Sequence, residues 1–174
     1  MAESARLTLE QLNALDRAAF VQVLGGIYEH SPWVAEAVWP QRPHASVAAL
    51  HAAMQAAVAA AGSAAQLALI RAHPELAGRA AIRGELTAAS SREQRGAGLD
   101  QCSAEEYARL TALNAAYRER FGFPFIVAVR GHTRQSIIDA MAQRLQHAPE
   151  AEIAEALRQV GRIAALRLAD LLGR

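Results

Sequence analysis

Lysine is absent from the sequence: all 18 basic residues of the 174 are arginine. This absence excludes chemistry that needs a lysine amine, such as Schiff-base formation with pyridoxal phosphate or a carbonyl substrate, and phosphate binding by a P-loop. An all-arginine set favours planar, two-pronged binding of carboxylates and amides. A GC-rich coding sequence would produce the same bias.

Cysteine is nearly absent too. Cys102 is the one cysteine, so an intramolecular disulfide and a multi-cysteine zinc or iron–sulfur site are excluded. The six histidines include no H-E-x-x-H motif and no close pair with a third ligand nearby, so we expect no metal site. Cys102 has no evident neighbouring base and G-x-S-x-G is missing, which leaves nucleophilic hydrolysis without support.

The sequence also lacks an excess of one charge and a long apolar run. With 18 basic and 17 acidic residues, it has no electrostatic footprint for nucleic acid or an anionic membrane, and we expect neither as a partner. The first residues contain no apolar signal segment, and no uncharged apolar run approaches the ~18 residues of a membrane span. We therefore expect a soluble, cytoplasmic protein with a single domain over residues 1–174.

Alanine is what the sequence has in abundance, with 42 residues of 174, whereas aromatic residues make up only 5%. Such a composition favours helices over strands. Helix-capping signals precede apolar residues at helical spacing, and they predict helices that begin near Thr8, Ser31, Ser46, Ser63 and Ser103. The first should continue to Gly25-Gly26, and two long helices should occupy about 134–147 and 150–172. We predict an all-α, single-domain bundle of about seven or more helices.

Two irregular stretches interrupt this pattern, and functional residues concentrate on such insertions. Residues 74–99 are rich in glycine, arginine and serine, and residues 121–131 form an apolar run with three of the four phenylalanines. The second stretch suits a short extended segment, but no partner strand is evident, so we expect no sheet.

Four features of these regions and their flanks have alternative interpretations. His73, at a helix end before Pro74, either faces a cleft or is a surface cap. Ser90, Glu93 and Gln94 share a face if their segment is helical, although S-x-x-E spacing favours Ser90 as a helix cap. The amides of residues 125–129 either bind a small polar ring or belong to plain core. Arg167 is either solvated or a carboxylate anchor.

Taken together, the motifs resemble the 2-oxo-4-hydroxy-4-carboxy-5-ureidoimidazoline (OHCU) decarboxylase family, whose enzymes catalyse the last step from urate to allantoin. The resemblance covers essentially the whole chain. It implies an all-α, cofactor-free lyase that forms a homodimer. The motifs that carry it are His73-Pro74-Glu75-Leu76, the Ser90-x-x-Glu93-Gln94 block continuing into Gly96-Ala-Gly-Leu99, and Phe121-Gly-Phe-Pro-Phe-Ile126.

The resemblance also implies roles for individual residues. His73 is the proton-transferring catalytic residue, and Glu93 is its acidic partner, which also contacts the substrate. Arg167 is a substrate ligand, with Arg162 five residues away as the alternative. The other expected substrate-binding residues are Pro74, Ser90, Ser91, Arg92, Gln94, Phe125, Ile126, Val127, Ala128 and Val129.

The implied reaction needs no cofactor. The departing carboxylate is on C4 beside a C5=N imine, so the substrate contains its own electron sink, and pyridoxal phosphate, thiamine or a metal is not required. The competing hypothesis is a non-catalytic helical module that binds a small ureide or a partner helix through the same grooves.

Overall fold

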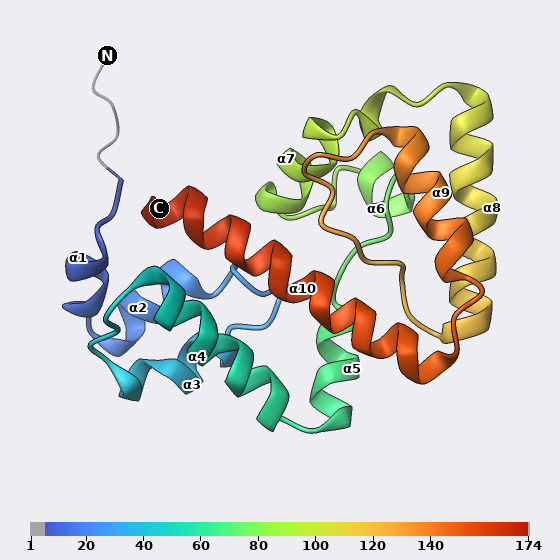
Figure 1. The fold of residues 1–174 in the computed structure, drawn as a ribbon. Coiled ribbons are helices and arrows are strands. Elements are labelled where there is room, and N and C mark those ends of the chain that lie inside the picture. Colours follow the sequence, from blue (N-terminus) through green and yellow to red (C-terminus); the bar gives the residue numbers. More distant parts are fainter. Residues whose placement is uncertain (1–5, 174) are drawn as a thin grey trace, which may run out of the picture. The chain divides into compact units, whose positions relative to one another are not determined.

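The all-α prediction is confirmed by the computed structural model, which describes residues 6–173 and contains no strand in that range. The described chain forms ten α-helices and two 3-10 helices (Figure 1). The α-helices are α1 (Leu9–Asn13), α2 (Arg17–Leu24), α3 (Trp33–Val38), α4 (Val47–Ala60), α5 (Ser63–Arg71), α6 (Arg79–Ile82), α7 (Ala88–Gly96), α8 (Ala104–Phe121), α9 (Arg134–Arg144) and α10 (Pro149–Leu172). The 3-10 helices are η1 (Trp39–Gln41) and η2 (Leu99–Gln101).

The described residues divide into two compact units. The terminal unit consists of residues up to 69 together with those from 161 onward, and the central unit consists of residues 70–160. The chain passes between the units within α5 and within α10.

The terminal unit begins with the capping box predicted at Thr8. The single helix expected from there to Gly25-Gly26 is wrong, because the chain breaks after Asn13 and starts α2 at a new cap. The Asp16 carboxylate accepts a hydrogen bond from the Ala19 amide at 2.8 Å, which favours a second helix start over continuation. α3 and α4 pack side by side in this unit (Figure 1).

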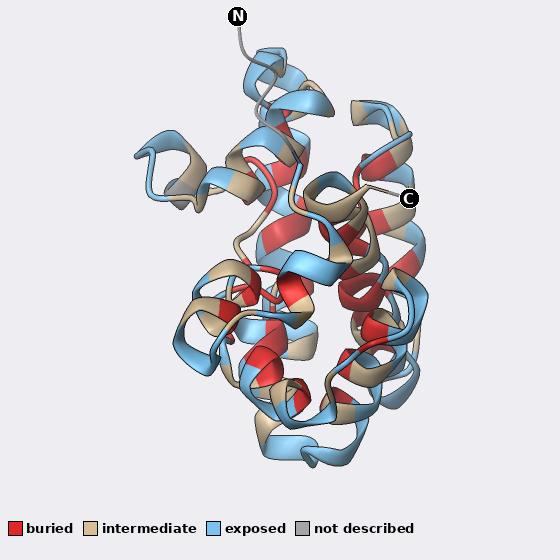
Figure 2. Ribbon diagram, turned by 90° about the vertical axis from the view of Figure 1, so that its left-hand side faces the viewer, coloured by how far each residue is buried: buried red, intermediate tan, exposed pale blue. Residues whose placement is uncertain are grey.

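The central unit is built around α8 and α9, which lie against each other (Figure 1). α8 begins after the capping box predicted at Ser103 and ends at Phe121, and the residue that caps it, Gly122, has a φ of +75° in the left-handed region. Apolar residues of both helices, among them Leu110, Ile137 and Met141, are fully buried. Most helices have one buried and one exposed side (Figure 2).

The stretch 74–99, expected to be irregular, contains the helices α6 and α7. The interpretation of Ser90 as a helix cap is wrong. The cap of α7 is Thr87, whose hydroxyl accepts a hydrogen bond from the Ser90 amide at 3.2 Å. Ser90 therefore lies in the first turn of α7, and Glu93 and Gln94 follow at i+3 and i+4.

The second irregular stretch is as expected, since residues 122–133 form neither helix nor strand. The two long C-terminal helices are present as well, although α9 ends at Arg144 rather than near residue 147. Among the described residues, no single helix has the length and apolar character of a membrane span. α4 and α5 satisfy those criteria only as a pair bent by 115°.

Candidate functional site

His73 lies where α5 gives way to a short loop. It is 7% exposed, and its amide donates to the Ile70 carbonyl at 3.2 Å, closing the last turn. Pro74 follows and prevents the helix from continuing. Four residues after His73, Ala77 has a φ of +51°, a conformation that is unfavourable for any residue with a Cβ atom. The loop must therefore be held in place by its surroundings.

Two buried side-chain amides hold this loop. The Gln94 Oε1 atom accepts from the Ala77 amide at 2.9 Å, and its Nε2 donates to the Glu75 carbonyl at 3.2 Å. Asn114 Nδ2 donates to the Leu76 carbonyl at 2.9 Å. The turn after His73 is thus fixed by α7 on one side and α8 on the other, and it contacts the second predicted motif directly through Gln94.

The residues of the 90–94 block differ in their exposure. Ser90 and Gln94 are buried, Ser91 and Glu93 are partly buried, and Arg92 is exposed. The helical spacing explains the difference, because residues i and i+4 share the face that packs inward. Of the five predicted residues, Ser90 and Gln94 thus lie most deeply in the central unit.

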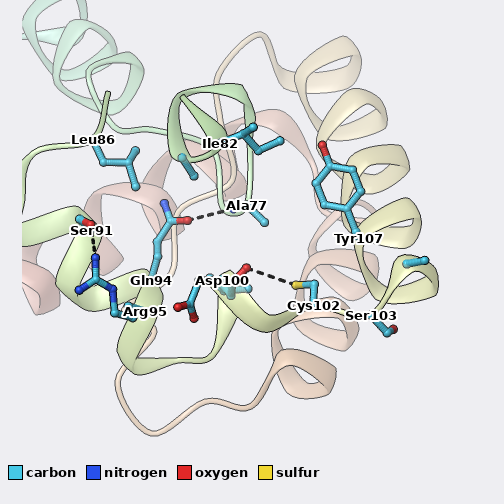
Figure 3. Close-up of a pocket in the computed structure, with 13 residues that line it drawn as sticks. Ala77, Ile82, Leu86, Ser91, Gln94, Arg95, Asp100, Cys102, Ser103 and Tyr107 are labelled. Carbon is cyan, nitrogen blue, oxygen red and sulfur yellow. Dashed lines mark hydrogen bonds between the residues drawn. The ribbon is translucent and has the colours of Figure 1, made fainter. Parts of the chain in front are cut away.

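A cavity of about 520 Å³ opens next to Gln94 (Figure 3). Ser91, Gln94 and Arg95 of α7 line one side, and Cys102 and Tyr107 line another. Its volume falls in the range of small-molecule pockets. Of the predicted site residues, Ser91 and Gln94 line this cavity, so it lies beside the loop that follows His73.

Cys102 in this cavity is not an activated nucleophile. Its Sγ donates to the Leu99 carbonyl at 3.4 Å. Burial and the nearby Glu106 carboxylate raise the pKa of the Cys102 thiol above its ordinary value. A neutral thiol is a weak nucleophile at neutral pH. The structure therefore gives no reason to revise the sequence argument against thiol-based hydrolysis.

The apolar segment 125–129 is buried along its whole length. Two of its main-chain groups bind side chains of the central unit: the Ile126 carbonyl accepts from Arg144 Nη1 at 2.6 Å, and the Ala128 amide donates to Gln159 Oε1 at 3.0 Å. The Val129 carbonyl accepts from the His132 amide at 2.9 Å. The segment is therefore part of the core, and the binding of a small polar ring by its amides stays a prediction.

A buried ionic cluster lies next to this segment. Glu152, fully buried, accepts from Tyr117 Oη at 2.5 Å and from Arg144 Nε at 2.6 Å, and its other oxygen is 3.0 Å from His147 Nδ1. Burial, followed by the hydrogen bond to the Glu152 carboxylate, raises the pKa of Tyr117. The phenol thus remains a hydrogen-bond donor throughout the physiological range.

Arg167 belongs to the terminal unit, on α10. It is 8% exposed, its Nη1 is 2.8 Å from Glu29 Oε2, and the same nitrogen donates to the Gly26 carbonyl at 3.0 Å. Arg162, the alternative, is exposed. The Arg167 guanidinium is thus held in a fixed orientation by a buried carboxylate, and the choice between Arg167 and Arg162 as substrate ligand stays a prediction.

Apart from Gln94, the residues that hold the site's main chain were not predicted from the sequence. Asn114 did give a signal, because it is a polar residue within the buried face of α8. Arg144, Glu152 and Gln159 gave none, because no periodicity connects them with residues 125–129. The described residues contain no group of three or more side chains able to hold a metal ion.

Comparison with known proteins gives concordant results. A family model described as OHCU decarboxylase matches residues 13–169. A 2-oxo-4-hydroxy-4-carboxy-5-ureidoimidazoline decarboxylase of Haloferax volcanii is 48% identical over 94% of this chain and 95% of its own length. The mouse (Mus musculus) protein of that name is 44% identical over 96% and 94%, respectively.

Solved structures give the same picture. The crystal structure of an (S)-allantoin synthase superposes with a TM-score of 0.78 at 35% identity, covering 95% of this chain and 54% of that one. An OHCU decarboxylase solved in the presence of (S)-allantoin has a TM-score of 0.69 at 20% identity, over 92% of this chain and 100% of that one. The second comparison bears on the fold alone.

Proposed function

This chain belongs to the OHCU decarboxylase family, and we propose that it converts 2-oxo-4-hydroxy-4-carboxy-5-ureidoimidazoline to (S)-allantoin and CO2 in urate degradation. It is a carboxy-lyase on this account, with His73 and Glu93 as the catalytic residues. The observation that carries the proposal is the direct contact between the two motifs. Gln94, next to Glu93, binds the main chain of Glu75 and Ala77, two and four residues after His73.

The chemistry follows from the substrate. When the bond from C4 to the carboxylate breaks, its electron pair forms a C4=C5 double bond, and the C5=N π electrons move to nitrogen, which takes a proton. The C4 hydroxyl then loses its proton as C4=O forms, and C5 gains one. Across the reaction two protons are gained and one is lost, so the conversion consumes one proton from solvent.

The protein has three tasks in this sequence. It holds the carboxylate out of the ring plane, removes the proton of the C4 hydroxyl, and protonates C5 on one face to give a single enantiomer. A histidine with an acidic partner suits proton transfer near neutral pH. His73 takes the hydroxyl proton and supplies the proton at C5, while Glu93 orients the imidazole and stabilises its charged form.

Substrate binding is assigned to the other residues predicted from the sequence. Ser90 and Gln94, on the buried face of α7, and Pro74 contact the ring or the ureido group. Main-chain groups of residues 125–129 bind ring carbonyls and N–H groups, and Arg167 binds a carboxylate or carbonyl as a planar anchor. Preorganised donors of this kind cost no reorganisation when charge develops. Ser91 and Arg92 complete the proposed set.

The alternative is a helical module that binds a ureide without reacting. The cavity beside Gln94 is compatible with it, as pockets of this size serve binding as well as catalysis. The two functions differ in the rate of one step: only the enzyme accelerates the release of CO2.

An assay with freshly generated substrate separates them. Urate oxidase and 5-hydroxyisourate hydrolase supply the ureidoimidazoline, and the protein is added while CO2 release is followed. We expect CO2 evolution faster than spontaneous decay and proportional to protein concentration. Binding of (S)-allantoin with CO2 release at the spontaneous rate would instead establish the non-catalytic module.

The homodimer and the cytoplasmic location implied by the family are part of this proposal. Sedimentation equilibrium tests the first, with a mass of twice 18.6 kDa as the expected result. A measured mass of one chain at assay concentrations would contradict the homodimer but not the proposed reaction.

A further inference from the structure

Several buried polar side chains bind the main chain of the segment 125–129, and the mechanism above does not use them. Arg144 on α9 donates from Nη1 to the Ile126 carbonyl at 2.6 Å, and its guanidinium carbon is 4.4 Å from the centroid of the Phe125 ring. One side chain therefore fixes both the main chain and a side chain of the segment.

Arg144 is itself held by Glu152, which has no exposed surface. A buried ion pair adds little net stability, since desolvation of the two charges offsets their attraction. The pair instead fixes the orientation of the Arg144 guanidinium. The Glu152 carboxylate holds one edge of that planar group, so the donor on the other edge has a fixed direction. That direction is toward the carbonyl of Ile126.

Gln159 on α10 makes the second anchor. Its Oε1 accepts from the Ala128 amide at 3.0 Å, while its Nε2 donates to Glu155 Oε1 at 2.8 Å. The bond to the carboxylate orients the amide so that its oxygen faces Ala128. The two anchored groups, the Ile126 carbonyl and the Ala128 amide, are two residues apart in the segment.

We propose that Arg144, oriented by Glu152, and Gln159 are positioning residues for the reaction. They hold the segment 125–129 from behind and so set where its main-chain groups meet the substrate. The inference rests on the proposed function, because only contact of this segment with the substrate gives the anchors a catalytic consequence. Neither residue touches the reacting atoms in this account.

Two variants remove the anchors with little change in volume. Arg144→Lys keeps a charge opposite Glu152, but a single ammonium cannot bind the carboxylate, bind the Ile126 carbonyl and stack on Phe125 together. Gln159→Met keeps the shape of the side chain and removes the acceptor. The control is Arg109→Lys, at an exposed position of α8.

Three measurements are compared: hydrogen–deuterium exchange of residues 122–133, kcat and KM, and thermal unfolding by circular dichroism. We expect both anchor variants to be folded at the assay temperature and to exchange the amides of residues 125–129 faster than wild type. Their kcat/KM should fall by about tenfold or more, because small displacements of positioned groups have large effects on rate. Arg109→Lys should match wild type in all three.

The outcomes distinguish this inference from the proposed function. Wild-type protein without decarboxylase activity would overturn both. Active wild type with anchor variants of equal kcat/KM would overturn the inference alone, as would variants that unfold at lower temperature yet keep full activity below their midpoint. If Arg144→Lys does not fold, Gln159→Met decides the matter.

Discussion

Asn114 shows at the scale of one residue how a buried polar group serves the site. Its Nδ2 donates to the Leu76 carbonyl in the loop after His73. We expect Asn114→Leu to leave that buried carbonyl without a donor and to lower the free energy of unfolding by about 1–3 kcal/mol. The displaced loop should also lower kcat/KM.

Urea unfolding and steady-state kinetics check this prediction. Thr111→Leu, at an exposed position of the same helix, is the control and should change stability by less than about 0.5 kcal/mol. An Asn114→Leu protein as stable and as active as wild type would show that the bond to Leu76 does not hold the loop.

Individual site residues could be predicted where the residue type and its position in the sequence indicated a role. His73 was marked by its place before a proline, and Ser90 and Gln94 by helical spacing. The burial of these three and the contact of Gln94 with residues 75 and 77 come from the structure. Arg144 and Glu152 were beyond prediction, because their pairing is decided by how α9 and α10 pack, which no local pattern encodes.

Among the helices, α7 shows how a cap decides which residues face the site. Its cap is Thr87, whose hydroxyl binds the Ser90 amide. Thr87→Ala should lower the free energy of unfolding by about 1 kcal/mol, whereas Thr87→Ser should restore most of that loss because it keeps the hydroxyl. Chemical denaturation measures both, and equal stability of the two variants would contradict the assigned cap.

Helix starts were predicted correctly where the sequence offered one capping residue, and wrongly where two possible capping residues lay close together. Thr8, Ser46 and Ser103 cap α1, α4 and α8 as predicted. The S-x-x-E spacing at Ser90 competed with Thr87 three residues earlier, and Thr87 prevailed. The break before Asp16 was missed because apolar residues continue at helical spacing on both sides of it.

On the scale of the whole molecule, buried tyrosines make stability depend on alkaline pH. Burial raises the pKa of Tyr28 to about 12, and its hydroxyl has no hydrogen-bond partner among the described residues. The unfolded chain loses this proton near pH 10. Since the unfolded state then binds fewer protons than the folded state, stability falls as pH rises through 10 toward 12.

Thermal or urea unfolding between pH 9 and 11 tests this expectation. Tyr28→Phe should reduce the loss between pH 10 and 11 by about 1 kcal/mol, and it should not destabilise the protein at pH 7, because it removes an unpartnered polar atom. Tyr107→Phe, at an exposed tyrosine, should leave the slope unchanged. Identical slopes for both variants would show that Tyr28 does not titrate differently on folding.

The all-α class of the whole molecule was predictable from composition, because alanine and leucine supply helix and little strand. The division into two compact units was not, since it depends on contacts between residues far apart in the sequence.

The most direct test of the account compares two identical substitutions at different histidines. His73→Asn removes the proposed proton-transferring group, and His30→Asn changes an exposed histidine whose φ of +47° asparagine tolerates. Substrate is generated in place, and the circular dichroism of allantoin is followed. We predict a rapid one-handed signal with wild type and His30→Asn, and only slow racemic decay with folded His73→Asn. A full one-handed signal from His73→Asn would contradict the central claim.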